Sequence, residues 1–351
     1  MVNGMLRRWR KDAIFEMFEG NLRLPRRQVL AGCGAFLATG LSAGDARGWQ
    51  VWKDAFLRPD GRVVDDLQDA ASHSEGQGYG MVLAQAEGDR AAFARMETWA
   101  AQVLAVRDDG LMSWRWRRGQ AAPDPQTATD GDLFRAWALW RAVHQSGWTE
   151  FAGRAEAIVA GLVSRCLAVD PRTEDEPLLT PAADSFRGAQ RVLFNPSYIM
   201  SRALRELGQA HGAPMLIRAA DHGETVLAEL GAAGLVPDWT LVTPDGFRPS
   251  PRHSALHGYD AARVALYLIW SGRGDHPAVA RSAELYDQAG PVPVVATSDG
   301  IVRQVSDYAG FRALRALVRC IPLPGAMPGQ PYYPATLGRL AGIARREGGC
   351  A

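Results

Sequence analysis

Apolar residues recur at helical spacing along most of the chain after residue 46. Leu133, Ala136, Trp137 and Trp140, for example, fall at positions i, i+3, i+4 and i+7, so they would share one face of a helix. The same spacing predicts about eleven helices, over residues 49–57, 78–86, 90–106, 133–144, 151–167, 198–209, 213–230, 260–270, 278–288, 308–320 and 335–346. Alternating patterns typical of strands are scarce, and the best of them cover only residues 178–179 and 301–304.

Glycine and proline interrupt these helical segments at short and irregular intervals. The 351 residues include 37 Gly and 21 Pro, which is too frequent an interruption for a coiled coil. The segments also lack the sharp period of a helical solenoid, and no linker of shifted composition divides them. We therefore predict an all-α fold in which residues 47–351 form a single domain, built as a toroid of antiparallel helix pairs.

The first 46 residues have a different pattern, which is typical of an export signal. Basic residues precede an apolar run from Val29 to Leu41, and small residues follow it, with Ala46 a candidate cleavage position. The stretch Arg26-Arg27-Gln28-Val29-Leu30 resembles a twin-arginine signal. We therefore expect residues 1–46 to be removed and the mature chain to be periplasmic or secreted. The alternative is an amphipathic N-terminal helix of a cytosolic protein.

Charge, hydropathy and cysteine content exclude several classes of protein. The 39 Lys+Arg and 38 Asp+Glu residues give a formal net charge of +1, so we expect no nucleic-acid partner. The chain contains no run of 18 or more apolar residues, and we expect no membrane insertion of the mature chain. Four cysteines are too few for a disulfide scaffold. Since three of them follow the leader, at least one thiol is expected to stay free.

Motifs for metal, nucleotide and serine-nucleophile chemistry are missing from the sequence. There is no His-Glu-x-x-His, no Cys-x-x-Cys and no Walker loop, and the seven histidines are scattered. A Gly-x-Ser-x-Gly nucleophile elbow is also absent. We therefore expect neither a metal site nor a cofactor.

Two polar segments open predicted helices with candidate catalytic carboxylates. Glu75 is surrounded by small residues that would let a ligand approach the backbone, although an acid at this place could also simply stabilise a helix N-terminus. Asp130 and Asp132 precede the helix predicted over residues 133–144. We expect one of these two aspartates to cap that helix and place Asp132 in its first turn, which leaves Asp130 available for a ligand.

A third polar segment pairs an acid with a base. Asp260 and Arg263 lie three residues apart and therefore on one helical face, where they can form an ion pair. A carboxylate paired in this way stays ionised near neutral pH, as a general base requires. The plainer alternative is an ion pair that only stabilises the helix.

Aromatic residues in polar loops suggest a ligand with apolar faces. The chain has 11 Trp, and Trp114, Trp116 and Trp239 lie in polar stretches rather than in apolar-periodic segments. Aromatic faces in a wet groove stack on the apolar faces of sugar rings, while carboxylates bind the hydroxyls. For any single tryptophan, packing in the core remains the commoner role.

Taken together, these segments resemble glycoside hydrolase family 8. The matching stretches occur in the order of that family and cover essentially the whole mature chain. They are Gly61-Arg62-Val63-Val64-Asp65, Ser74-Glu75-Gly76-Gln77-Gly78-Tyr79-Gly80-Met81, Ala128-Thr129-Asp130-Gly131-Asp132, Asn195-Pro196-Ser197-Tyr198, Pro237-Asp238-Trp239 and Tyr259-Asp260-Ala261-Ala262-Arg263. The last two are most similar to the periplasmic endoglucanases of the family that accompany bacterial cellulose synthase.

The resemblance implies a fold and a set of roles. The fold is an (α/α)6 toroid whose groove hydrolyses β-1,4-glucan with inversion at the anomeric carbon. By motif position, Glu75 matches the general acid, Asp260 the general base whose charge Arg263 holds, and Asp130 an aspartate that contacts the sugar at the cleavage subsite. The candidates for sugar contacts are Trp114, Tyr198, Trp239, Tyr259 and Arg263.

The function that this implies is an endo-β-1,4-glucanase that acts on cellulose and assists cellulose biosynthesis. Its expected partner is a β-1,4-glucan, and a cellulose synthase complex is a further candidate. Two alternatives stay open, namely the same fold acting on xylan, mixed-linkage glucan or chitosan, and a non-catalytic glucan-binding factor of a synthase complex. The near-neutral charge argues against a chitosanase, and the presence of Glu75, Asp130 and Asp260 argues against a pure binder.

Overall fold

The computed structural model of the chain describes residues 43–185 and 187–350, with side chains from residue 47 onward. Residues 1–42 of the predicted leader therefore lie outside the described residues, while its last four residues begin the first described helix. The α-helices are α2 (Ala43–Phe56), α3 (Ser74–Ala86), α4 (Arg90–Trp99), α5 (Thr129–His144), α6 (Glu156–Arg165), α7 (Ser201–Ala210), α8 (Pro214–Ala233), α9 (Ala262–Trp270), α10 (Pro277–Tyr286), α11 (Ala309–Val318) and α12 (Tyr332–Gly348). Each overlaps one of the predicted segments, so the helical pattern of the sequence is confirmed.

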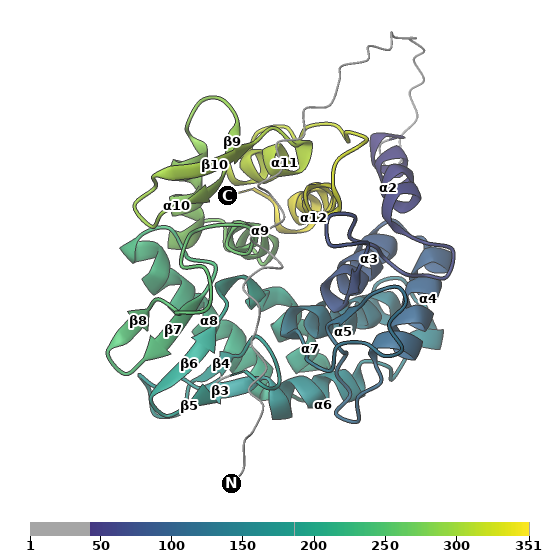
Figure 1. The fold of residues 1–351 in the computed structure, drawn as a ribbon, viewed down its shortest axis with the longest axis horizontal. Coiled ribbons are helices and arrows are strands. Elements are labelled where there is room, and N and C mark those ends of the chain that lie inside the picture. The colour runs from purple at the N-terminus through teal and green to yellow at the C-terminus, as the bar shows by residue number, and fades with distance from the viewer. Residues whose placement is uncertain (1–42, 186, 351) are drawn as a thin grey trace.

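The helices form two concentric rings (Figure 1). The inner ring consists of α3, α5, α7, α9 and α12, each of which contacts the next, and α12 closes the ring on α3. The outer helices pack against this ring, with α4 on α3, α6 on α5, α8 on α7, α10 on α9, α11 on α12 and α2 also on α12. The described helices thus form five inner and six outer members of the double ring of an (α/α)6 barrel, and the all-α prediction is confirmed.

Small residues let the inner helices approach closely where the ring carries polar side chains. A Cβ atom at Gly78 would lie 2.9 Å from the Cβ of Phe134, and one at Gly131 would lie 2.3 Å from the Oγ of Ser74. Side chains at these two positions would push α3 and α5 apart. The glycines therefore bring the first turns of α3 and α5, which carry Glu75 and Asp130, side by side.

Short antiparallel strands lie in the loops between the helices. Four of them form one sheet in the order β5 (Arg187–Gly188), β6 (Arg191–Phe194), β7 (Thr240–Thr243) and β8 (Gly246–Arg248). The others form three pairs, which are β1 (Ser72–His73) with β2 (Arg115–Trp116), β3 (Leu167–Val169) with β4 (Pro177–Leu179), and β9 (Val292–Ala296) with β10 (Val302–Ser306). The sequence predicted only the segments that became β4 and β10. The register Phe194↔Thr240 between β6 and β7 brings the loop after β6 beside the segment before β7.

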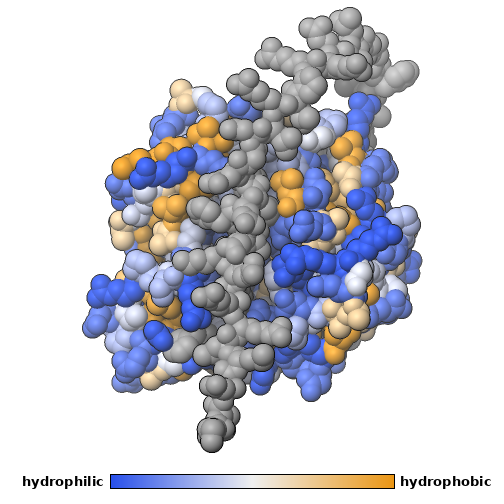
Figure 2. Space-filling model, in the orientation of Figure 1, coloured by the Kyte–Doolittle hydropathy of each residue, from blue (hydrophilic) through white to orange (hydrophobic). Residues whose placement is uncertain are grey.

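The hydrophobic core fills the space within and between the rings. All nine residues of α9 are buried, and Trp137 of α5 lies edge-on to Trp270 of α9 with ring centroids 5.1 Å apart. The described part of the face in Figure 2 is mostly hydrophilic, with apolar residues gathered over the β9–β10 hairpin. No helix among the described residues combines the length and the apolar character needed to cross a membrane.

The cysteines meet the expectation of one free thiol. Cys320, just after α11, forms a disulfide with Cys350, which follows α12. Cys166 is buried and free. The disulfide therefore ties the C-terminal end of the described chain to the end of its neighbouring helix.

Candidate active site

The candidate catalytic residues meet at one buried arginine. Arg263 lies in the first turn of α9 and only 2% of its side chain is exposed. Its Nη1 atom donates a hydrogen bond to Oε2 of Glu75, and its Nη2 atom donates one to Oδ1 of Asp260. Oδ2 of Asp130 lies 3.8 Å from the same Nη1 atom. One guanidinium thus holds all three predicted carboxylates, which lie at the beginnings of α3, α5 and α9.

Neutral oxygens complete the environment of this guanidinium. Nη1 also donates to the hydroxyl of Tyr79 at 3.1 Å, and Nη2 donates to the Oγ atom of Ser197 at 2.8 Å. The Tyr79 hydroxyl is in turn 2.5 Å from the hydroxyl of Tyr267. Because acceptors from several elements surround it, the cation of Arg263 has a fixed position.

The three carboxylates differ in their access to solvent. The side chains of Glu75 and Asp260 are 19% and 22% exposed, whereas that of Asp130 is only 4% exposed. A ligand from solution can therefore reach Glu75 and Asp260 more readily than Asp130. Because different nitrogens of one guanidinium bind Glu75 and Asp260, their carboxylates lie side by side at the same site.

Burial raises the pKa of two of these carboxyl groups. For Asp130 the main cause is loss of solvent, and the adjacent charge of Glu75 raises the pKa further. For Asp260 burial also raises the pKa, but the charge of Arg263 opposes it. Asp130 therefore tends to keep its proton, while Arg263 offsets part of the effect of burial on Asp260.

Trp239 and Tyr198 lie beside Asp260. The indole Nε1 of Trp239 donates a hydrogen bond of 3.0 Å to Oδ2 of Asp260. One face of the indole stacks on His253, with ring centroids 4.6 Å apart, and the ring of Tyr198 is 6.3 Å from the ring of Trp239. These aromatic rings therefore form one wall next to the carboxylate.

Comparison with known proteins agrees with this geometry. The family model for glycosyl hydrolases family 8 matches residues 24–289. A probable endoglucanase from Novacetimonas hansenii is 32% identical over 336 residues, which are 91% of this chain and 96% of that protein. The chain belongs to glycosyl hydrolase family 8.

Solved structures of this family share the fold. Endoglucanase Cel10, a family 8 glycosyl hydrolase from Klebsiella pneumoniae, aligns with a TM-score of 0.79 and 27% identity over 86% of this chain and 99% of that one. The endo-β-1,4-glucanase CMCax from Acetobacter xylinum aligns with a TM-score of 0.77 and 29% identity over 87% of this chain and 98% of that one. The similarity extends over nearly the full length of both structures.

The two remaining aromatic candidates of this family 8 domain lie beside segments that carry the carboxylates. Trp114 accepts a hydrogen bond from the backbone amide of Ser74 through its carbonyl oxygen, at 2.8 Å, and the guanidinium of Arg115 lies 4.0 Å from its ring centroid. The ring of Tyr259 packs against Tyr333, whose hydroxyl donates to the carbonyl oxygen of Tyr259. Trp114 thus adjoins the residue before Glu75, and Tyr259 is the residue before Asp260.

The expectation that Asp130 or Asp132 caps the helix is wrong. The residue before α5 is Ala128, and no side chain caps the helix there. Asp130 instead accepts from the amide of Gly131 at 2.8 Å. Asp132, which lies in the first turn as predicted, accepts from the amide of Met112 at 2.8 Å, and burial raises its pKa to about 8. The carboxylate of Asp130 therefore stays on an amide of the first turn and beside Arg263, whereas a tertiary contact with Met112 holds Asp132.

Four residues around the site were not singled out from the sequence. Tyr79 follows Glu75 by four residues and Tyr267 follows Arg263 by four, so helical periodicity could have placed them on the same faces. Ser197 and Asp238 lie in loops, where no local pattern shows that they reach α9. Among the described residues, no group of three or more His, Cys, Asp or Glu side chains is arranged to hold a metal ion.

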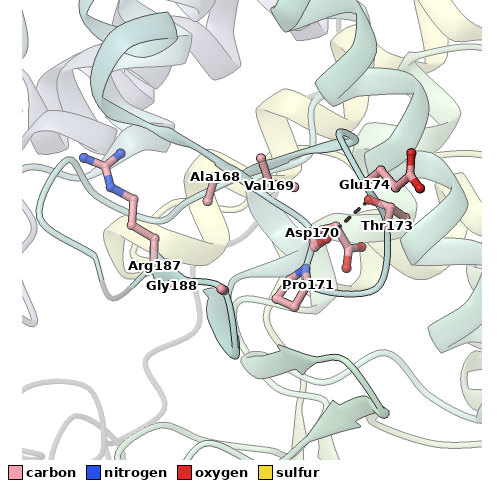
Figure 3. A pocket seen from close by; sticks show the side chains of 9 residues that line it. Ala168, Val169, Asp170, Pro171, Thr173, Glu174, Arg187 and Gly188 are labelled. Carbon is pink, nitrogen blue, oxygen red and sulfur yellow. Dashed lines mark hydrogen bonds between the residues drawn. The ribbon is translucent and has the colours of Figure 1, made fainter.

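A separate pocket of about 470 Å³ lies against the β3–β4 pair and β5 (Figure 3). The carboxylate of Asp170 on its wall is already bound by Arg172 and by Nε2 of His222, which is 2.8 Å away. The Nη1 atom of Arg187 donates hydrogen bonds to the carbonyl oxygens of Arg165 and Leu167. These charged groups are occupied, so the candidate active site is the Arg263 cluster and not this pocket.

We expect Arg263→Met to destabilise the protein in a pH-dependent way. Loss of the cation leaves buried carboxylates uncompensated, at a cost of about 3–5 kcal/mol. Because burial raises the pKa of Asp130 and Asp260 in the folded state, their charges oppose folding at high pH, and protonation removes that cost. The loss should be largest above neutral pH and should shrink as the pH falls toward about 4, near the pKa of an unfolded aspartate.

Thermal unfolding from pH 8 to pH 4 measures this effect. Arg319→Met is the matched control, because Arg319 pairs with Asp287 at 2.9 Å on the surface, where such pairs contribute about 0–1 kcal/mol. An Arg263→Met protein that is as stable as the control at pH 8 would contradict the role of this cation.

Proposed function

We propose that the protein is an endo-β-1,4-glucanase that cleaves internal linkages of cellulose with inversion at the anomeric carbon. The observation that carries the proposal is the pair of partly exposed carboxylates, Glu75 and Asp260, held on different nitrogens of one buried Arg263. Relatives described as endoglucanases support the choice of a β-1,4-glucan.

In this mechanism Glu75 is the general acid. Its carboxyl group gives a proton to the glycosidic oxygen as the bond between that oxygen and the anomeric carbon breaks. Asp130 lies beside Glu75, and burial together with the charge of Glu75 raises the pKa of Asp130. We also assign Asp130 the sugar contact at the cleavage subsite that the family resemblance implies.

Asp260 is the general base of the same step. It takes a proton from a water molecule whose oxygen attacks the anomeric carbon from the face opposite the leaving group, so the configuration inverts. Arg263 and the indole N–H of Trp239 bind its two oxygens and favour the ionised form. Since burial raises the pKa of Asp260, activity should fall as the pH drops through that pKa.

Aromatic rings near the carboxylates are proposed to bind the sugar units. Tyr198 and Trp239 form the wall beside Asp260, and Trp114 and Tyr259 flank the segments that carry Glu75 and Asp260. One face of Trp239 is covered by His253, so its edge and its other face remain for the glucan. Arg263 would contact the substrate only through the carboxylates that it orients.

We further propose that the enzyme works outside the cytoplasm and assists cellulose biosynthesis. The disulfide between Cys320 and Cys350 supports an oxidising compartment, and the resemblance of Pro237-Asp238-Trp239 to endoglucanases that accompany cellulose synthase supports the biological role. Residues 1–46 would form the export signal and residues 47–351 the mature domain. The intact mass of the exported protein tests this assignment: cleavage near Ala46 is expected, and an uncleaved chain would contradict it.

Replacement of either catalytic carboxylate should abolish cleavage without unfolding the protein. We expect Glu75→Gln and Asp260→Asn each to lower kcat by about 10²- to 10⁴-fold, the usual contribution of a positioned acid or base. The measurement is reducing-end release together with viscosity loss on carboxymethyl-cellulose, because rapid viscosity loss identifies internal cleavage.

The matched controls are Glu284→Gln and Asp287→Asn, whose parent side chains are 65% exposed on and just after α10. Both should keep wild-type rates. A wild type that is inactive on cellulose, xylan and chitosan would refute the enzyme assignment and favour a glucan-binding factor. Activity on xylan or chitosan alone would keep the mechanism and change the substrate.

A further inference from the structure

We infer that Asp238 is a positioning residue for the general base Asp260. The inference rests on the proposed function, because it concerns the same hydrolytic site. Asp238 touches none of the reacting groups through a hydrogen bond of its own. It acts through the backbone on either side of Asp260.

Asp238 holds the turn that carries Asp260. It is buried just before β7, and its Oδ1 atom accepts hydrogen bonds from the amides of Gly258 at 3.0 Å and Ala261 at 2.8 Å. These two amides lie on either side of Asp260 in the sequence. A single carboxylate oxygen therefore fixes the backbone on both sides of the base, directly before α9 begins at Ala262.

The segment that contains Asp238 is itself anchored to the chain that leads into this turn. The amide of Asp238 donates to the carbonyl oxygen of Leu256 at 2.7 Å, and the amide of Trp239 donates to that of Ser254 at 3.1 Å. Trp239 then binds the carboxylate of Asp260 through its indole. Two consecutive residues thus hold the base. Asp238 binds the backbone on either side of Asp260, and Trp239 binds the carboxylate of Asp260.

The carboxylate of Asp238 and the turn are in tight contact. A Cβ atom at Gly258 would lie 2.5 Å from Oδ2 of Asp238. Only glycine leaves room for the carboxylate at that position. The close approach explains how an acid from before β7 can reach the backbone next to Asp260.

The groups that face Asp238 leave its charge uncompensated. They are Asp260 and Tyr259 in the turn, and Ser254 in the preceding segment. His257, nearby in the same segment, is buried with its pKa lowered to about 4, so it is neutral at pH 7. Among the described residues no cation forms an ion pair with Asp238, whereas Arg263 binds Asp260 on its other side.

Burial and the charge of Asp260 together raise the pKa of Asp238 to about 7. Asp238 is therefore largely protonated below pH 7. A protonated carboxyl group still accepts hydrogen bonds through its other oxygen, so Asp238 can hold the turn in either protonation state.

The substitution Asp238→Asn separates the charge from the hydrogen bonds. An asparagine Oδ1 atom can still accept from both amides, but it carries no charge. We expect Asp238→Asn to keep kcat at pH 7 within about threefold of wild type. The acidic limb of its kcat/KM profile on a neutral glucan such as hydroxyethyl-cellulose should stay in place, because Asp238 is already uncharged there. Asp238→Ala should instead lower kcat by about 10- to 100-fold with little change in KM, because the base is misplaced.

Asp132→Asn is the matched control. Asp132 is also a buried aspartate that accepts from a backbone amide and has a raised pKa, but Asp260 is not among the charges that act on it. Its substitution should leave kcat near the wild-type value. Circular dichroism and thermal unfolding show whether each variant is folded, and Asp238→Asn alone decides the inference if Asp238→Ala does not fold.

A folded Asp238→Asn enzyme whose kcat is more than about tenfold below that of the wild type would overturn the inference that the hydrogen bonds of Oδ1 position the base. A folded Asp238→Ala enzyme with wild-type kcat would overturn the positioning role. A wild type that is inactive on every β-1,4-glucan would instead refute the proposed function, and the inference with it. The two failures are therefore distinguishable.

Discussion

A buried guanidinium surrounded by carboxylates is the interaction on which the rest of this structure depends. Moving a charged group out of water costs several kcal/mol unless an opposite charge compensates it. Arg263 and the carboxylates of Glu75, Asp130 and Asp260 provide that compensation for one another. The free-energy cost of burying each of these groups is lower because the others are present. The fold must therefore bring all of them to one place.

The double ring of helices brings these side chains together. The acids lie at the beginnings of inner helices, where a side chain can reach the middle of the ring without displacing the core below it. Close packing of α3 on α5, through Gly78 and Gly131, sets the distance between Glu75 and Asp130. Longer-range restraints finish the arrangement, since Ser197, Asp238 and Trp239 come from loops that short strands hold beside α9. The site is precise because rigid helices carry its charges and hydrogen-bonded loops support them.

The sequence predicts much of this fold, because helical periodicity is a local signal. All eleven helical segments were identified, whereas most of the strands were missed: they are only two to five residues long, and distant partners stabilise them. The spacing of Asp260 and Arg263 predicted their ion pair correctly, but nothing local showed that the same arginine also binds Glu75. The cap expected from Asp130 or Asp132 was wrong because the helix begins directly after Ala128, which places both aspartates inside its first turn. Asp238 could not be placed from the sequence, since its partners Gly258 and Ala261 are about twenty residues away across a hairpin.

The stereochemistry of hydrolysis tests the central claim most directly. Proton NMR can follow cellopentaose during the first minutes of cleavage, before mutarotation mixes the anomers of the new reducing end. An acid and a base held by Arg263, with water attacking opposite the leaving group, predict that the α-anomer forms first from the β-linked substrate. Initial formation of the β-anomer would show that the configuration is retained, and would contradict the assignment of Asp260 as a general base.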